Sequence, residues 1–279
     1  MKVRIIVDST ADLAEEVKSR LTVVPLTIHF GDEEYVDGVT ISHKKFYEKL
    51  IESDVLPSTS QATPDAFIKV FDKIKAAGES AVVLTISSVL SGTYQSAMIA
   101  ADEYSDIYVI DTKSVALGSG ILAEMALKLA DEGLSAAEIA EKLTEERENV
   151  RIIAMLDTLE FLKRGGRISK TAAFAGGVLS IKPVINLQDG EINVLGKARG
   201  SRQGNNLLVK EIQNAGGVDF TKPLLLGYTG LSDTLLQKYI EDSAHLWEEH
   251  ASKLRTTVVG SVVGTHAGPG AVAVAFFKN

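Results

Sequence analysis

The chain has 279 residues, 45% of them hydrophobic, which is enough to bury a sizeable core in one large domain or two smaller ones. Its formal net charge of -8 opposes binding to nucleic acid or to an anionic membrane surface, so neither partner is expected. Cysteine is absent, which excludes disulfides, thiolate nucleophiles and cysteine-based metal sites. The first apolar run ends at Asp8, too early for a secretion signal, and we expect a cytoplasmic protein without stable membrane insertion.

The first half of the chain alternates between short apolar runs and segments with helical periodicity. Apolar runs that predict strands lie at residues 3–7, 21–30, 81–86 and 107–110. The alternation predicts an α/β fold in which helices flank a mainly parallel sheet. The polar residues 8–12 are expected to cap the helix that follows the first strand.

The pattern changes after Gly165 and Gly166. Asp189-Gly190 between two apolar runs predicts a two-residue hairpin and therefore antiparallel strands. Residues 256–277 are predicted to form two buried strands around a loop. We divide the chain into an N-terminal α/β domain, residues 1–165, which carries Ser/Thr loops able to bind an anion, and a second α/β domain, residues 166–279, with antiparallel strands.

Motifs for cofactors and metals are not matched. The spacing from Gly190 to Gly196-Lys197 is wrong for a phosphate-binding loop, and Ala198 replaces the hydroxyl residue that such a loop needs. No H-E-x-x-H motif is present, so no catalytic metal is expected. The sequence predicts neither a cofactor nor a metal.

A candidate anion site follows the strand at residues 81–86. Ser91-Gly92-Thr93 begins a helical segment, and the amides at a helix start favour negative charge. Hydroxyls of Ser91 and of Thr59, in the loop 57–64, could donate hydrogen bonds to the two oxygens of a carboxylate. Two alternatives stay open: Ser91 and Thr93 as ordinary helix caps, and His266 as a core histidine.

Six segments carry a resemblance to a known family. They are VRIIVDSTADL (3–13), STSQ (58–61), ISSVLSGTYQSA (86–97), LEFLKRGGRIS (159–169), KPVINLQDGEI (182–192) and GTHAGPGAVAV (264–274). In these motifs and in their order the chain resembles the DegV family of fatty-acid-binding proteins over essentially its whole length. The resemblance implies a two-domain α/β fold that encloses one long-chain fatty acid, such as palmitate, stearate or oleate, between its domains.

The resemblance also implies roles for individual residues. The carboxylate would be held by Thr59 and by the turn of Ser91, Gly92 and Thr93, with Arg167 and His266 completing a polar network. Such a protein presents the carboxyl group to a separate fatty-acid kinase, which forms an acyl phosphate. We therefore expect a carrier that is not itself an enzyme.

Further expectations concern the channel and the partner. Phe174 and Val178, in an apolar segment with small residues, could line the acyl channel, or could simply pack as a helix. Arg199 and Arg202 are expected to face the kinase, and the protein is expected to be a monomer. The alternatives are an acyl hydrolase or a phosphotransferase that uses Ser91 and His266, and a lipid-responsive sensor.

Overall fold

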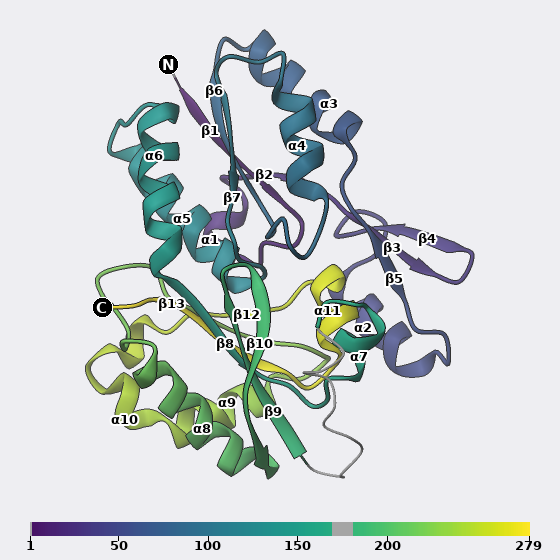
Figure 1. Ribbon diagram of the computed structural model, residues 1–279, viewed down its shortest axis with the longest axis vertical. Helices are drawn as coiled ribbons and strands as arrows, with labels where there is room; N and C mark the ends of the chain where they lie inside the picture. The colour runs from purple at the N-terminus through teal and green to yellow at the C-terminus, as the bar shows by residue number, and fades with distance from the viewer. Residues whose placement is uncertain (1, 169–180) are drawn as a thin grey trace.

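The computed structural model describes residues 2–168 and 181–279 (Figure 1). Its upper half in that view contains a four-stranded sheet of order β2-β1-β6-β7, in which every pair is parallel. The strands are β1 (Val3–Asp8), β2 (Thr22–Val24), β6 (Ser80–Thr85) and β7 (Ile107–Asp111). Alternate residues of β1 face opposite sides, so the sheet is buried on both faces.

Helices cover both faces of this parallel sheet. On one face lie α3 (Pro64–Ala76) and α4 (Thr93–Ala101), and on the other lie α5 (Leu117–Asp131) and α6 (Ala136–Glu146). The capping box of Ser135 and Glu138 starts α6, as their spacing predicts. Beside this layer, β3 (Thr27–Phe30), β4 (Glu33–Val36) and β5 (Ser58–Ser60) form a small antiparallel sheet next to α2 (His43–Glu52).

The lower half contains a six-stranded sheet of order β10-β9-β8-β13-β11-β12. Its strands are β8 (Val150–Met155), β9 (Ile181–Gln188), β10 (Glu191–Arg199), β11 (Leu225–Tyr228), β12 (Thr256–Val258) and β13 (Val272–Phe277). Only β11 and β12 pair in parallel. One face packs against α8 (Gly200–Asn214) and α9 (Thr234–Asp242), and the other faces α5 of the upper half.

Short helices fill the connections. They are α1 (Glu15–Lys18), η1 (Arg147–Asn149), α7 (Glu160–Arg164), α10 (Ala244–Trp247), η2 (Glu248–Lys253) and α11 (Ser261–Ala267). Of these, α7 and α11 pack against each other where the two halves meet.

The predicted α/β fold, with a parallel sheet followed by antiparallel strands, is confirmed. The division at residues 165 and 166 stays a prediction, and β8, which precedes it, pairs with β9 and β13 in the six-stranded sheet. Asp189-Gly190 does join β9 to β10 as an antiparallel hairpin.

Three local predictions were wrong. Residues 21–30 form two strands in different sheets, because Pro25 separates them and offers no amide to a ladder. Residues 256–277 contain α11 between their strands, where a loop was expected. Residues 8–12 do not cap α1, whose N-cap is Ala14 without a side-chain hydrogen bond. The acidic members of that segment instead accept hydrogen bonds from other loops.

Candidate functional site

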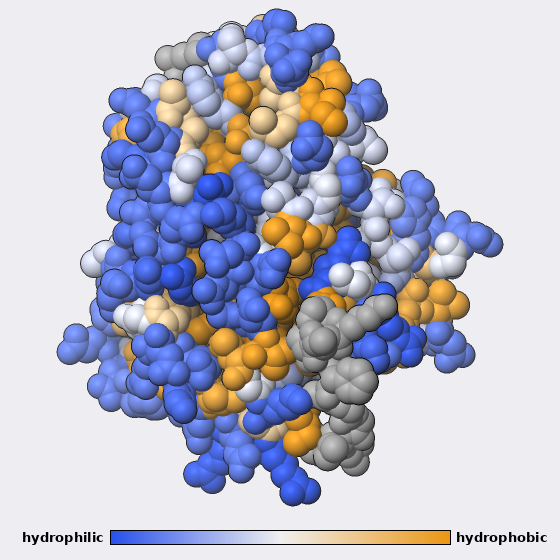
Figure 2. All heavy atoms as spheres, viewed as in Figure 1, coloured by the Kyte–Doolittle hydropathy of each residue, from blue (hydrophilic) through white to orange (hydrophobic). Residues whose placement is uncertain are grey.

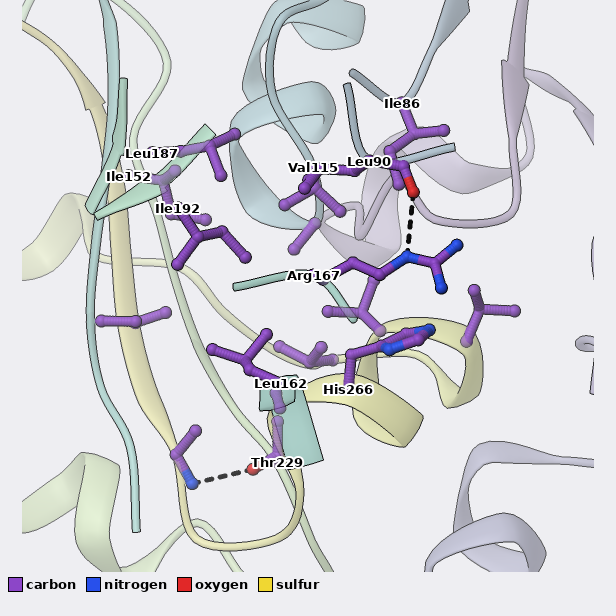
Figure 3. Close-up of a pocket in the computed structure, with 18 of the residues that line it drawn as sticks. Ile86, Leu90, Val115, Ile152, Leu162, Arg167, Leu187, Ile192, Thr229 and His266 are labelled. Atoms are coloured by element: carbon purple, nitrogen blue, oxygen red, sulfur yellow. Dashed lines mark hydrogen bonds between the residues drawn. The ribbon is translucent and has the colours of Figure 1, made fainter. Parts of the chain in front are cut away.

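A cavity of about 370 Å³ lies between the two large sheets, within the range of about 300–1,000 Å³ usual for small-molecule sites. On the face of the molecule shown in Figure 2, apolar residues gather near the middle, between the upper and lower halves. The lining is mostly aliphatic, and Figure 3 shows Ile152, Leu187 and Ile192 at one end and Arg167 and His266 at the other. The cavity is therefore amphipathic along its length.

Small residues on the six-stranded sheet make room for the cavity. Ala154 of β8 is the register partner of Ala273 of β13, which is in turn the partner of Gly227 of β11. All three line the cavity. These alanine and glycine residues form a row across three adjacent strands. Because their side chains are so small, they leave a trough between the layers that larger side chains would fill.

The turn between β6 and α4 forms one wall of the polar end. Ser91 precedes the helix, and its Oγ lies 2.9 Å from the Thr93 hydroxyl and accepts the Thr93 amide at 3.3 Å. Gly92 is the N-cap residue. The predicted Ser91-Gly92-Thr93 turn is thus at a helix N-terminus, but only Ser91 and Gly92 line the cavity, because Thr93 is fully buried behind them.

The STSQ segment lies against this turn. Gln61 donates from Nε2 to the Ser96 hydroxyl at 2.8 Å, and a Cβ atom on Gly92 would be 2.1 Å from Gln61 Oε1. Glycine at position 92 therefore allows the two loops to touch. This packing brings Thr59, paired with Ile28 at the edge of the small sheet, to the polar end of the cavity.

Arg167 follows α7 and reaches across to the same turn. Its Nε donates to the Leu90 carbonyl at 3.0 Å (Figure 3), and its Nη1 donates to the Gly165 carbonyl at 2.7 Å. These two backbone contacts hold a planar guanidinium in place beside Ser91. A positive charge fixed in a partly enclosed site is suited to a carboxylate.

His266 of α11 completes the polar end. Its Nε2 lies 3.0 Å from the Thr59 hydroxyl, and its buried Nδ1 has no hydrogen-bond partner among the residues that the structure describes. Burial, and then the neighbouring Arg167 charge, lowers the pKa of His266 to about 4. The imidazole is consequently neutral at pH 7, so that Arg167 carries the positive charge of this cluster.

Two buried aspartates position the loops that carry these groups. Asp8, at the end of β1, accepts the Ile86 amide at 2.6 Å, at the start of the turn that holds Ser91. Asp12 accepts the Gly260 amide at 2.7 Å, directly before α11 and His266. Burial raises the pKa of both carboxyls. The sequence interpretation gave these residues a capping role; a Ser/Thr/Asp cluster directly after a buried strand was the available signal.

The other predicted residues have different outcomes. Phe174 and Val178 lie outside the described residues. Arg199, at the end of β10, and Arg202, in α8, are both exposed.

Within residues 2–168 and 181–279, no group of three or more His, Cys, Asp or Glu side chains could hold a metal ion, and no helix is both long and apolar enough to cross a bilayer.

The geometry separates two tasks. One end of the cavity offers hydroxyls, a guanidinium and an imidazole, which can hold an anionic group, while the rest is mostly aliphatic, with Asn186, Tyr228 and Thr229 as its polar members. The side-chain partner of Ser91 is the Thr93 hydroxyl, whereas His266 contacts Thr59, so Ser91 and His266 are not hydrogen-bonded to each other as a nucleophile and its base would be.

Comparison with known proteins agrees with this arrangement. The family model described as an uncharacterised protein of the DegV family matches residues 2–279. The chain belongs to the DegV family. A DegV domain-containing protein of Caldanaerobacter subterraneus is 35% identical, with 99% of this chain and 98% of that protein covered.

Solved structures of DegV proteins share the whole fold. A Thermus thermophilus DegV family protein described by its fatty acid binding superimposes with a TM-score of 0.88 and 28% identity, and each chain is covered completely. A DegV lipid binding protein of Thermotoga maritima superimposes with a TM-score of 0.85 and 27% identity, covering 99% of this chain and 98% of that one. DegV relatives with this fold therefore carry fatty acids as ligands.

Proposed function

We propose that this protein binds one long-chain fatty acid, with its carboxylate at Thr59, Ser91, Arg167 and His266 and its acyl chain in the apolar part of the cavity. The observation that carries the proposal is the division of one partly enclosed cavity into a polar end and a mostly aliphatic remainder. The fatty-acid-binding relative from Thermus thermophilus and the lipid-binding relative from Thermotoga maritima support it.

The energetics are consistent with a buried acyl chain. Burial contributes about 0.8 kcal/mol per methylene, or roughly 10 kcal/mol for a chain of about sixteen carbons, before the costs of ordering are subtracted. A buried carboxylate without partners would lose several kcal/mol. Arg167 and the hydroxyls offset that loss, so the tail provides most of the affinity and the head group sets the orientation.

The proposed role is that of a carrier and not of an enzyme. Ser91 contacts Thr93 and the start of α4, an arrangement suited to donating a hydrogen bond to an anion. The resemblance in sequence extends the proposal to a fatty-acid kinase that receives the carboxyl group, with the exposed Arg199 and Arg202 as candidate contacts. We propose a monomeric carrier in the cytoplasm.

The direct test is denaturing extraction of the purified protein followed by mass spectrometry, combined with uptake of oleate and stearate by delipidated protein. We expect one fatty acid per chain. A protein that contains no lipid and takes up neither acid would overturn the proposal. Esterase turnover abolished by Ser91→Ala would instead favour a hydrolase.

The kinase step has its own test. Protein loaded with oleate should yield acyl phosphate when a fatty-acid kinase and ATP are added, and Arg199→Ala with Arg202→Ala should slow this reaction without changing oleate affinity. A kinase that ignores the loaded protein would remove the carrier role and leave lipid binding intact.

A further inference from the structure

The β9–β10 hairpin reaches from the lower sheet to the upper half of the molecule (Figure 1). At its tip, the Ser87 hydroxyl donates to the Gly190 carbonyl at 2.9 Å, and both residues are buried. Ser87 belongs to the turn that also holds Ser91, whose amide donates to the Ser87 carbonyl at 3.1 Å. One turn therefore carries part of the head-group site and a contact with the hairpin tip.

Glycine at position 190 makes this close approach possible. Asp189 and Gly190 have φ values of 52° and 84°, as required at the two central positions of a tight hairpin turn. A Cβ atom on Gly190 would lie 2.5 Å from Ser87 Oγ. The backbone of the tip thus rests directly on the serine.

The two segments joined by this hydrogen bond form a wall of the cavity. Ile86 and Leu90 line it from the turn, and the register pair Leu187 and Ile192 lines it from the hairpin (Figure 3). The wall is consequently a seam between two separate parts of the chain.

The hairpin side of the seam is weakly anchored in its own sheet. β9 pairs with β8 only through residues 184–186, whereas its pairing with β10 covers the whole hairpin. Residues 187–192 therefore extend beyond the β8 ladder. The tip can therefore move without breaking a ladder hydrogen bond to β8.

We propose that the β9–β10 hairpin is a strap that opens to let the acyl chain enter and leave, and that the hydrogen bond from Ser87 to Gly190 is its latch. The proposal rests on the proposed fatty-acid binding. An acyl chain packed between the two sheets leaves when a wall moves, and the closure of this seam includes the polar contact from Ser87 to Gly190. Ser87 acts as a positioning residue that joins the head-group turn to the strap.

A reversible cross-link provides a sharp test. The Cβ position of Gly190 lies 3.6 Å from Ser87 Cβ, within the spacing of about 3.5–4.5 Å found in disulfides. Because the chain has no cysteine, Ser87→Cys with Gly190→Cys would introduce the only two thiols. We expect oxidation to slow release of oleate into dioleoylphosphatidylcholine vesicles at least tenfold, and dithiothreitol to restore the rate of the same sample.

Single variants test the latch without a cross-link. Ser87→Ala should release oleate several-fold faster than the wild type. Ser88→Ala is the matched control, because its exposed hydroxyl donates to Asp111 at 2.5 Å and does not contact the hairpin. Oxidised protein that exchanges oleate as fast as the reduced sample would overturn the strap, and equal release from Ser87→Ala and the wild type would overturn the latch.

A second readout separates this inference from the proposed function. Wild-type protein that takes up no oleate would refute fatty-acid binding. Amide hydrogen exchange of residues 187–192 in ligand-free protein then tests whether the hairpin opens, independently of lipid binding. The disulfide should slow this exchange relative to the reduced sample, and unchanged exchange would refute the opening motion.

Discussion

The two ends of the cavity are built in different ways. The apolar end depends on register within one sheet, since Ala154, Ala273 and Gly227 lie in a row across three adjacent strands. The polar end is assembled from short segments that are far apart in the chain, namely the edge strand β5, the β6–α4 turn, the segment after α7, and the short helix α11.

Because of this difference, we expect the apolar end to provide most of the affinity for a fatty acid and the polar end to set its orientation. A trough in a hydrogen-bonded sheet is rigid, so it has a stable volume for aliphatic contact. Loops held by side-chain hydrogen bonds adapt more readily, and their donors suit a charged head group. Substitutions at the two ends should therefore have different effects: filling the trough should depend on acyl-chain length, and changes at the polar end should depend on the charge of the head group.

The largest effect is expected where the trough is filled. Ala273→Leu should weaken stearate binding by about 100-fold, because displacing roughly four methylenes from burial costs about 3 kcal/mol. Calorimetric titration across a series of chain lengths would show smaller losses for shorter acids. Ala137→Leu, on the exposed side of α6, is the matched control. Unchanged stearate affinity in Ala273→Leu would place the acyl chain elsewhere.

Loss of the positive charge should come next in size. Arg167→Gln should weaken stearate binding by about 10- to 100-fold, because a hydrogen bond to a charged group contributes about 1.5–3 kcal/mol. Binding of stearyl alcohol, which carries no charge, should change little. Arg164→Gln serves as the control, since Arg164 is exposed and pairs with Glu160 within α7. Equal losses for acid and alcohol would indicate damage to the cavity.

The buried imidazole should make ligand-free stability depend on pH. The pKa of His266 is about 4 in the folded protein, against an unfolded value of about 6.5. Between these two pKa values the unfolded state binds more protons than the folded state. The stability that the neutral His266 imidazole contributes is therefore present above pH 6.5 and is lost as the pH falls toward 4. The loss should be on the order of 3 kcal/mol.

Urea unfolding at a series of pH values measures this contribution. His266→Gln should remove it and flatten the profile in that range, whereas His245→Gln, at an exposed position, should keep the wild-type slope. A His266→Gln profile that follows the wild type throughout would show that the imidazole is not held neutral by its surroundings.

The sequence predicted features that depend on local signals. Ser91-Gly92-Thr93 at a helix start and the Asp189-Gly190 hairpin could both be read from a few adjacent residues. The alanine and glycine row could not, since it depends on the register of strands more than 70 residues apart, as for Gly227 and Ala154. The contacts of Asp8 with Ile86 and of Asp12 with Gly260 could not be predicted from the sequence either, because they also join residues far apart in the chain.

The smallest effect is expected at Thr59, where the polar end depends on one neutral hydroxyl. Thr59→Val keeps the shape but removes the contact with His266, and a neutral hydrogen bond contributes about 0.5–1.5 kcal/mol, so stearate should bind about 2- to 10-fold more weakly. Thr59→Ser retains the hydroxyl and should stay near the wild type. A loss in Thr59→Val as large as that in Arg167→Gln would mean that the hydroxyl and the guanidinium act as one network, since removal of either would then disorder the other. A small, acid-specific loss would show instead that the charge dominates orientation and that the hydroxyl only refines it.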